Sequence, residues 1–199
     1  MPNYKILHLI GGGEIGGAEQ HVLTLLEGIN SSSFALAVGC LVDGPFAQLT
    51  ESKHLPTLRF PMKHPLDLTP LPKLIEKIRQ EGFSLIHTHG SRANLLGRLA
   101  GRRLKLPVVS TVHSSLKQDY LSPQAALLAL ALDRLTLPMT SGVITVSEAL
   151  AQEVARRGAK NIRTIYNGVH SLPELAAEEE RARLRIHFRQ KWQIPEDAL

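Results

Sequence analysis

The sequence predicts an α/β fold of the Rossmann-like, doubly wound kind, in which helices cover both faces of a mainly parallel sheet. Short apolar runs rich in β-branched residues alternate with segments whose apolar residues recur every three or four positions. This alternation is typical of strands joined by amphipathic helices. A glycine-rich segment joins the first such strand to the first such helix. The 199 residues are enough for one domain of this kind with its own core.

The first strand is predicted at residues 5–10, which are mostly apolar on both faces, as in a strand covered on both sides. The glycine-rich segment Gly11–Gly17 follows it. Serines at 31–33 end the next helix before a second strand near residues 34–42. A strand, a helix and a strand in this order predict a right-handed parallel crossover. The helix carries one apolar stripe, formed by Val22, Leu25, Leu26 and Ile29.

The alternation continues to residue 166. Ser122 is predicted to cap a helix that opens with Pro123, and Ser147 to cap the helix from Glu148. Asn167 and Gly168 predict a turn. Further strands are predicted at residues 57–60, 84–88, 108–112, 142–146 and 162–166. Further helices are predicted at residues 45–51, along the stripe Leu71, Leu74, Ile75 and Ile78, at 92–104, from 123 onward, and at 148–157.

The last thirty residues have a different character. Ser171–Glu174 has the spacing of a capping box, and a charged, arginine-rich helix is predicted at residues 178–192. We therefore predict a Rossmann-like domain over residues 1–170 and a helical or linker segment over residues 171–199.

Composition excludes several classes of protein. With 43% hydrophobic and 21% charged residues, the chain is neither disordered nor a coiled coil. Cys40 is the one cysteine, so the sequence offers neither an internal disulfide nor a cysteine-rich zinc site. The longest apolar stretch, residues 125–132, is far shorter than the ~20 residues that span a bilayer, and the first residues lack the order of a signal peptide. We predict a cytoplasmic protein.

The net charge of +5 suggests anionic partners. Five cations crowd one predicted helix and its end, which favours an anionic membrane surface as a partner, although an ordinary amphipathic helix with snorkelling side chains explains them equally well. Aromatic residues make up 5% of the chain and form no visible stacking platform, so we predict no nucleic-acid partner. The five cations are Arg92, Arg98, Arg102, Arg103 and Lys105.

The glycine-rich segment is the clearest candidate for a binding site. Glycines let a ligand approach the backbone, and the free amides of the following helix suit a phosphate or another polar oxygen ligand. Gly11-x-Gly13-x-x-Gly16 also matches the dinucleotide fingerprint, with Asp43 as the ribose-binding acid. Asp43 lies further along the chain than the fingerprint's ~20 residues. An NAD(P)-dependent oxidoreductase therefore stays open as an alternative.

Histidines follow two of the middle strands. His87 and His89 share one face of a strand end, but no third ligand lies at a recognisable spacing, so we predict no metal site. His113 ends the strand at residues 108–112, where an imidazole can donate to a sugar hydroxyl, transfer a proton, or simply bond the backbone. The sequence contains no serine nucleophile elbow, so a catalytic triad is set aside.

Five motifs in this order resemble the N-terminal half of the retaining GT-B glycosyltransferases, the large group 1 (family 4-like) family. Each motif is short, but the set spans most of the predicted domain. The motifs are Gly16–Val22, His87–Gly90, Thr111–Ser114, Val143–Glu148 and Ile165–Val169.

The resemblance implies two Rossmann-like domains across a cleft, with the acceptor held mainly by the N-terminal domain. It places Gly16 and Gly17 beside the nucleotide-sugar donor. It makes His113, in contact with the transferred sugar, the candidate catalytic residue. The side chains that it places toward the acceptor are those of Glu19, His89, Arg92 and Asn94.

The resemblance also implies the reaction. A hexose would move with retention from a nucleotide-sugar, which is a substrate and not a cofactor, to a hydroxyl of a carbohydrate or lipid-linked acceptor. Cell-envelope polysaccharide or glycolipid synthesis is the expected setting, at the inner face of the membrane. The family's second domain, with a Glu-x7-Glu motif, is absent, so we expect this chain alone to be inactive. A non-catalytic module that binds anionic membranes remains the third alternative.

Overall fold

A computed structural model describes residues 4–29, 33–116, 119, 122–168 and 178–195. The chain divides into two compact units, Met1–Asn167 and Gly168–Leu199. The second unit contains the helix α7 (Glu178–Trp192), which the sequence predicts with the same bounds. The capping box expected at Ser171–Glu174 lies outside the described residues.

The first unit is built on a parallel sheet of seven strands in the order β3-β2-β1-β4-β5-β6-β7. This confirms the predicted Rossmann-like fold. β7 is two residues shorter than predicted, and the backbone at Asn167 is irregular where a turn was expected. The strands are β1 (Tyr4–Ile10), β2 (Phe34–Cys40), β3 (Thr57–Arg59), β4 (Leu85–His89), β5 (Val108–Val112), β6 (Gly142–Thr145) and β7 (Ile162–Thr164).

Every predicted helix of this unit is present. Ser122 Oγ accepts the Ala125 amide at 3.5 Å and Ser147 Oγ accepts the Leu150 amide at 3.3 Å, so both predicted caps are confirmed. A short 3-10 helix, η1 (Leu137–Met139), was not predicted. The α-helices are α1 (Gly17–Gly28), α2 (Pro45–Ser52), α3 (Leu71–Glu81), α4 (Ser91–Leu104), α5 (Pro123–Thr136) and α6 (Glu148–Arg156).

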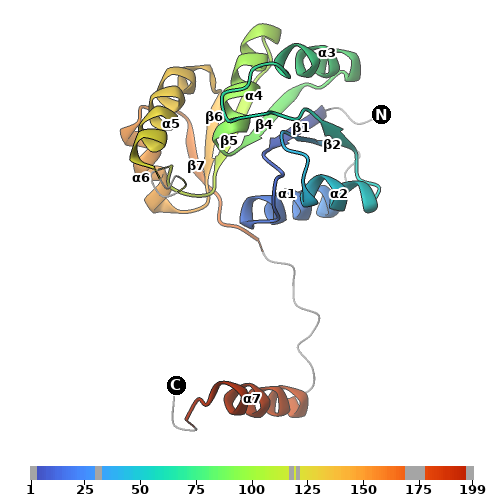
Figure 1. Ribbon diagram of the computed structural model, residues 1–199, viewed down its shortest axis with the longest axis vertical. Coiled ribbons are helices and arrows are strands. Elements are labelled where there is room, and N and C mark those ends of the chain that lie inside the picture. The colour runs from blue at the N-terminus through green and yellow to red at the C-terminus, as the bar shows by residue number, and fades with distance from the viewer. Residues whose placement is uncertain (1–3, 30–32, 117–118, 120–121, 169–177, 196–199) are drawn as a thin grey trace. The chain divides into compact units, whose positions relative to one another are not determined.

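The sheet is a middle layer with apolar cores on both sides. Figure 1 shows α1 and α2 on one side of the sheet and α3 and α4 on the other. Val22 and Phe46 of the first pair pack on Ile10, while Leu74 and Leu96 of the second pair pack with Leu7. β1 is therefore buried on both faces, as its apolar sequence predicts.

Two glycines let α4 lie unusually close to the sheet. A Cβ added to Gly97 would collide with the Thr88 side chain of β4, and one added to Gly101 would collide with Val108 of β5. The close approach fixes where α4 begins, at the carboxyl end of β4.

The strand order reverses direction between β1 and β4, which are hydrogen-bonded neighbours in the sheet. In open α/β sheets the carboxyl ends of the strands at such a switch point form the ligand-binding crevice. The segments that meet there are the glycine-rich segment after β1 and the start of α4 after β4.

Within the described residues, no helix combines the length and the hydrophobicity that a membrane span requires.

Candidate functional site

The glycine-rich segment after β1 is held by close backbone packing. Gly12 has a φ of +76°, which favours glycine, and a Cβ there would lie 3.2 Å from the Cys40 side chain. A Cβ at Gly44, just before α2, would collide with the carbonyl oxygen of Gly13. Glycine is therefore required both in the loop and in the segment beneath it.

The start of α1 is open on its outer side. No heavy atom lies within 4 Å of a Cβ built on Gly17, and Gly16 meets only a Glu19 oxygen, at 3.3 Å. Glu19 Oε2 accepts the Gly16 amide at 3.2 Å, so the Glu19 carboxylate is engaged in the first turn of its own helix. The open backbone at Gly16 and Gly17 leaves room for a polar ligand at a helix N-terminus.

Five histidines cluster at the carboxyl edge, four from the sheet and its edge and one from α1. His8 of β1 and His87 of β4 are register partners, so their side chains share one face of the sheet, with His89 two residues further on. His21 of α1 closes the cluster from above, with its ring centroid 5.1 Å from that of His113. Neither His8 nor His21 was predicted from the sequence as a site residue. The signal was available, because parallel pairing of the first and fourth strands places position 8 beside position 87.

Three of these histidines form a hydrogen-bonded chain that leads to the edge of the sheet. His8 Nδ1 lies 3.1 Å from His89 Nε2, and His89 Nδ1 lies 3.0 Å from His113 Nε2. A neutral imidazole has one N–H and one acceptor nitrogen, so both contacts must point in the same direction along the chain. The tautomer of His113 is therefore coupled to that of His8 through His89.

Burial keeps this cluster uncharged. Desolvation, with a smaller repulsion from His21, lowers the pKa of His8 and that of His113 to about 4. Burial also lowers the pKa values of His87 and His89 well below their usual value. At neutral pH the cluster therefore offers hydrogen bonds and no positive charge.

Among the described residues, His8, His87 and His89 place three nitrogen atoms within 4.8 Å of one another, close enough to converge on one metal ion. In the structure these rings already bond one another or Thr111, whose Oγ1 lies 2.7 Å from His87 Nε2. The prediction of no metal site stays a prediction.

The residues expected to face an acceptor differ in exposure. The His89 side chain is 2% exposed, which leaves little surface for direct contact with an acceptor. Its hydrogen bond to His113 connects it to the edge of the sheet. Asn94 is also buried, and its Oδ1 accepts a hydrogen bond from Thr88 Oγ1 at 2.7 Å. Arg92 is partly exposed at the start of α4.

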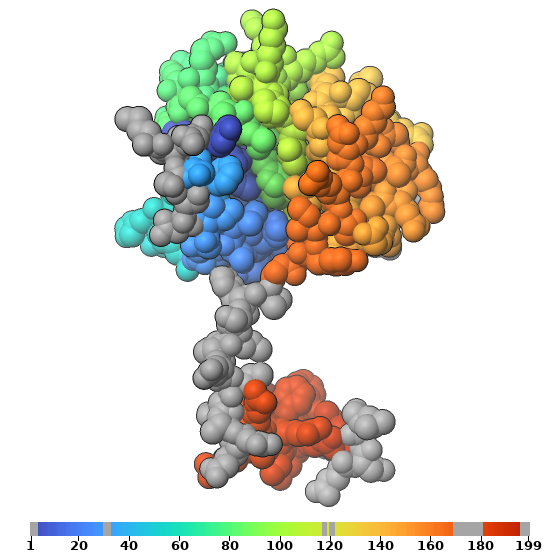
Figure 2. All heavy atoms as spheres, turned by 180° about the vertical axis from the view of Figure 1, so that it is seen from behind, coloured from blue at the N-terminus to red at the C-terminus, as the bar shows by residue number. Residues whose placement is uncertain are grey.

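Two cavities adjoin the start of α4. The larger, of about 280 Å³, is an apolar groove between α5 and the loop before α3, and it includes Arg92 at its α4 wall. The smaller, of about 90 Å³, has His113, Gly90 and Arg157 in its walls. Figure 2 shows the blue segment with α1 beside the orange segment with α6 and β7, and this cavity is lined by residues of both α1 and α6. Ser91, Asn94 and Asp133 line both cavities.

A buried ion-pair network lies under the smaller cavity. Asp133 of α5 pairs with Arg98 of α4 at 2.8 Å through Oδ1 and with Arg157 at 2.9 Å through Oδ2. Arg98 also donates to Thr136 Oγ1 at 3.0 Å. The network was missed by the sequence analysis, although a lone acid at the end of the apolar run of α5 was a signal for it.

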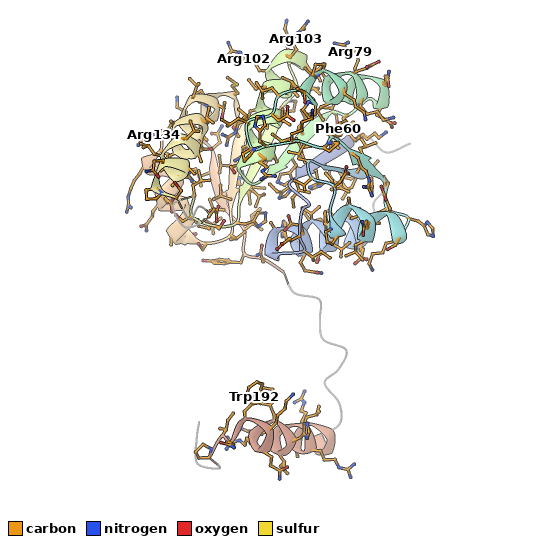
Figure 3. The ribbon with its side chains drawn as sticks, in the orientation of Figure 1. Phe60, Arg79, Arg102, Arg103, Arg134 and Trp192 are labelled. Atoms are coloured by element: carbon orange, nitrogen blue, oxygen red, sulfur yellow. The ribbon has the colours of Figure 1, made fainter. Side chains whose placement is uncertain are left out.

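The prediction that Arg98 belongs to a cationic surface on α4 is wrong. Arg98 is 1% exposed and paired, so it cannot contact a membrane. Figure 3 shows Arg102 and Arg103 pointing outward, on the same side of the unit as Arg79 of α3. Because α4 begins at the carboxyl edge of the sheet, these arginines lie about 17 Å along the helix from that edge.

Asp43, the residue expected to bind a ribose, is hydrogen-bonded to Arg59. Asp43 Oδ1 pairs with Arg59 Nη1 at 3.0 Å, and the same guanidinium bonds both carboxylate oxygens of Glu51 at 2.6–2.7 Å. In this structure Asp43 is therefore part of an ion-pair cluster with its own domain.

The fold is therefore a Rossmann-like unit whose carboxyl edge carries an open glycine turn, a histidine cluster and an apolar groove. The sequence profile of Glycosyltransferase Family 4 matches residues 15–171. The chain belongs to this family, which decides against the oxidoreductase alternative.

Known relatives agree with this assignment. The chain is 28% identical over 114 residues to the Escherichia coli UDP-Gal:alpha-D-GlcNAc-diphosphoundecaprenol alpha-1,3-galactosyltransferase, covering 55% of this chain and 30% of that protein. The crystal structure of Anabaena HepE in complex with UDP superimposes with a TM-score of 0.73 at 24% identity, over 92% of this chain and 50% of that one. A glycosyltransferase from Rickettsia africae superimposes with a TM-score of 0.71 at 16% identity, over 98% and 51% of the two chains. The chain thus spans about half the length of these solved structures and less of the E. coli enzyme.

Proposed function

We propose that this chain is the acceptor-side half of a hexosyltransferase that moves a sugar, with retention, from a nucleotide-sugar to the hydroxyl of a lipid-linked acceptor. The observation that carries the proposal is the arrangement of the carboxyl edge. An open helix N-terminus, an uncharged histidine and an apolar groove lie around the switch point of a family 4 domain.

The open backbone at Gly16 and Gly17 suits the donor. Amides at a helix N-terminus bind phosphate oxygens, and the absence of side chains lets a sugar lie against the turn. The Anabaena structures contain UDP and, in one case, UDP-glucose, which supports a uridine diphosphate sugar as the donor class. We propose a cytoplasmic setting in cell-envelope polysaccharide or glycolipid synthesis, because the E. coli relative's substrate is a diphosphoundecaprenol.

His113 is the proposed catalytic residue. In a retaining transfer of this family the acceptor hydroxyl attacks the sugar on the face that the nucleotide leaves. A neutral His113 would hydrogen-bond a hydroxyl of the transferred sugar, and the hydrogen bond between its Nε2 and His89 Nδ1 would fix its ring orientation. The positive charge that stabilises a leaving diphosphate would come from a second domain, in the half of the solved relatives that this chain does not span.

The apolar groove favours a lipid-linked acceptor over a free sugar. Leu66, Leu95, Leu128 and Leu132 line it, and Arg92 and His64 supply polar contacts for a headgroup. A groove of about 280 Å³ holds part of a lipid chain while the attached sugar reaches toward His113.

The groove can be tested by a matched pair of leucines on α5. Leu128 lines the groove, whereas Leu127 is 70% exposed and outside its lining. In the full-length protein, we expect Leu128→Ser to raise KM at least fivefold for a polyprenyl-diphosphate-linked acceptor and to leave KM for a short-chain analogue unchanged. Leu127→Ser should leave both values unchanged, and equal effects of the two variants would contradict the groove.

The catalytic role is tested by His113→Ala in the full-length protein, measured by transfer of labelled hexose from UDP-hexose. We expect kcat to fall at least 100-fold with a small change in donor KM. The 199-residue chain alone should show no transfer. Activity of His113→Ala close to that of the unmodified enzyme would overturn the role.

Peripheral attachment to anionic membranes would depend on Arg102, Arg103 and Lys105. Arg98 is not included because it is buried. We expect co-sedimentation with phosphatidylglycerol vesicles to fall for the double variant Arg102→Glu and Arg103→Glu, and to persist for Arg156→Glu on α6. Unchanged co-sedimentation of the double variant would remove this surface from the proposal.

A further inference from the structure

In the described residues, every buried side-chain nitrogen without a hydrogen-bond partner belongs to a residue that lines the smaller cavity. Six buried side-chain atoms lack a hydrogen-bond partner in the part of the chain that the structure describes, and two of them are oxygens of residues outside this cavity's lining. The other four belong to residues that line the cavity: Arg98 Nε, His113 Nδ1, Arg157 Nε and Arg157 Nη2. Buried polar groups in native proteins are nearly always paired, so this concentration points to a ligand that brings acceptor atoms.

The charges around the cavity point the same way. The side chains of Arg98, Arg157 and Asp133 are 1%, 6% and 8% exposed. Guanidinium groups stay protonated, and the ion pairs of these two buried cations all go to one carboxylate, that of Asp133. Glu153, four residues before Arg157, has a buried Oε1 without a hydrogen-bond partner, so its carboxylate does not hydrogen-bond either guanidinium through that atom. Burial lowers the pKa of Arg98 despite its bond to Asp133, as expected where compensation is incomplete. A buried, uncompensated charge is costly, and a bound anion would neutralise it.

The rest of the lining fits an anion. Gly90 and Ser91 bring the N-terminus of α4, a helix of 14 residues whose Ncap makes no side-chain hydrogen bond. Helix N-termini attract negative charge. Asp119 also lines the cavity, but it is exposed and its Oδ2 accepts a hydrogen bond from Ser114 Oγ at 2.9 Å. Solvent therefore screens its repulsion of an anion.

We propose that this cavity is an oxyanion site, in which the guanidinium groups of Arg157 and Arg98 bind a carboxylate or phosphate group. A volume of about 90 Å³ suits such a group and is too small for a whole sugar nucleotide. The planar guanidinium fork matches the two oxygens of either anion. Because His113 shares the lining, the anion lies beside the proposed catalytic residue, but its binding does not depend on sugar transfer.

The test measures binding to the 199-residue chain by calorimetry, in buffers of equal ionic strength. The probes are inorganic phosphate, glucuronate and UDP, with glucose as the uncharged counterpart of glucuronate. We expect phosphate or glucuronate to bind and glucose not to bind. Arg157→Gln should lower the affinity for the anion at least tenfold. Arg156 is the exposed neighbour of Arg157, and Arg156→Gln should bind the anion like the original chain. No binding of either anion, or equal loss in both variants, would overturn the site.

The folding of Arg157→Gln is a separate readout. The variant keeps the Arg98–Asp133 pair and removes one of the two buried cations, so without anion its Tm should be no lower than that of the original chain. A measurement without any variant follows the ¹⁵N–¹H signals of the arginine Nε groups during a phosphate titration. Those of Arg98 and Arg157 should move and that of Arg156 should not, and static signals for the first two would contradict the proposal.

The probes also distinguish the sources of the anion. Preference for glucuronate over phosphate indicates an acid carried by the acceptor. Displacement of phosphate by UDP, lost in Arg157→Gln, indicates the donor's phosphates. Preference for inorganic phosphate, without displacement by UDP, indicates a free anion that orders the edge of the sheet.

Discussion

At the scale of single residues, the histidine cluster shows how burial changes the protonation of histidine side chains. An exposed histidine changes charge near neutral pH, but His8 lies between the sheet and α1 and stays neutral until about pH 4. Its Nδ1 reaches His113 through one intermediate ring. The chemistry offered at the edge of the sheet therefore depends on a residue with 3% of its surface exposed.

This burial makes stability depend on pH. Below pH 6.5 the unfolded chain takes up a proton at position 8, while the folded chain does so only near pH 4, so stability is greatest above pH 6.5 and falls on acidification toward pH 4. We expect His8→Leu to reduce this slope by up to about 1.4 kcal/mol per pH unit. Urea unfolding at pH 7.0, 5.5 and 4.5 measures it.

The matched control is His187→Gln, at an exposed position on α7, which should leave the slope unchanged. At pH 7 His8→Leu should itself be less stable, by about 1–3 kcal/mol, because His89 Nε2 loses its partner. An unchanged pH slope in His8→Leu would show that the neutral state of His8 is not set by folding.

At the scale of elements, α4 carries most of the geometry of the site. It begins beside the histidine edge, contributes Arg92 and Asn94 to the apolar groove, and holds Arg98 under the smaller cavity. Its position against the sheet depends on Gly97 and Gly101, where no side chain fits.

We expect Gly97→Ala to destabilise the domain by about 1–3 kcal/mol through overpacking against Thr88, more than the ~1 kcal/mol that alanine gains in a helix. Gly28→Ala, at the exposed end of α1 where no atom lies within 4 Å of the added Cβ, should be neutral or stabilising. Chemical denaturation of both variants measures the difference. Equal effects would mean that the close approach of α4 is not strained by a methyl group.

Elements were predictable from the sequence, whereas side-chain partners were not. Apolar periodicity identified α4 and β4 to within a residue, because periodicity is a local property. The role of Arg98 was not local: its partner, Asp133, lies 35 residues away, and the same sequence is typical of a solvated cationic face. His113 was recognised from its motif, but the motif held no sign of His8 at the far end of the histidine chain.

At the scale of the whole molecule, the core of the fold lies within the first unit. Among the residues that the structure describes, the three apolar core clusters consist of residues between Leu7 and Ile162, all in the first unit. The exposed apolar side chains of α7, among them Phe188 and Trp192, belong to the second unit alone.

A chain that ends at Asn167 should therefore unfold within about 2 °C of the Tm of the 199-residue chain, because it keeps every residue of the described core clusters. Its phosphate affinity should also be unchanged, since the smaller cavity lies entirely within residues 18–157. Calorimetry of both chains measures the two quantities. A loss of several degrees would show that residues 168–199 stabilise the first unit.

Ser91, Asn94 and Asp133 line both the apolar groove and the smaller cavity, so the two spaces share one wall. On the two proposals made above, substitutions in the unshared walls should alter either lipid binding or anion binding, whereas substitutions in the shared wall should alter both. The two specificities of such a domain are then free to change separately, through drift or by engineering.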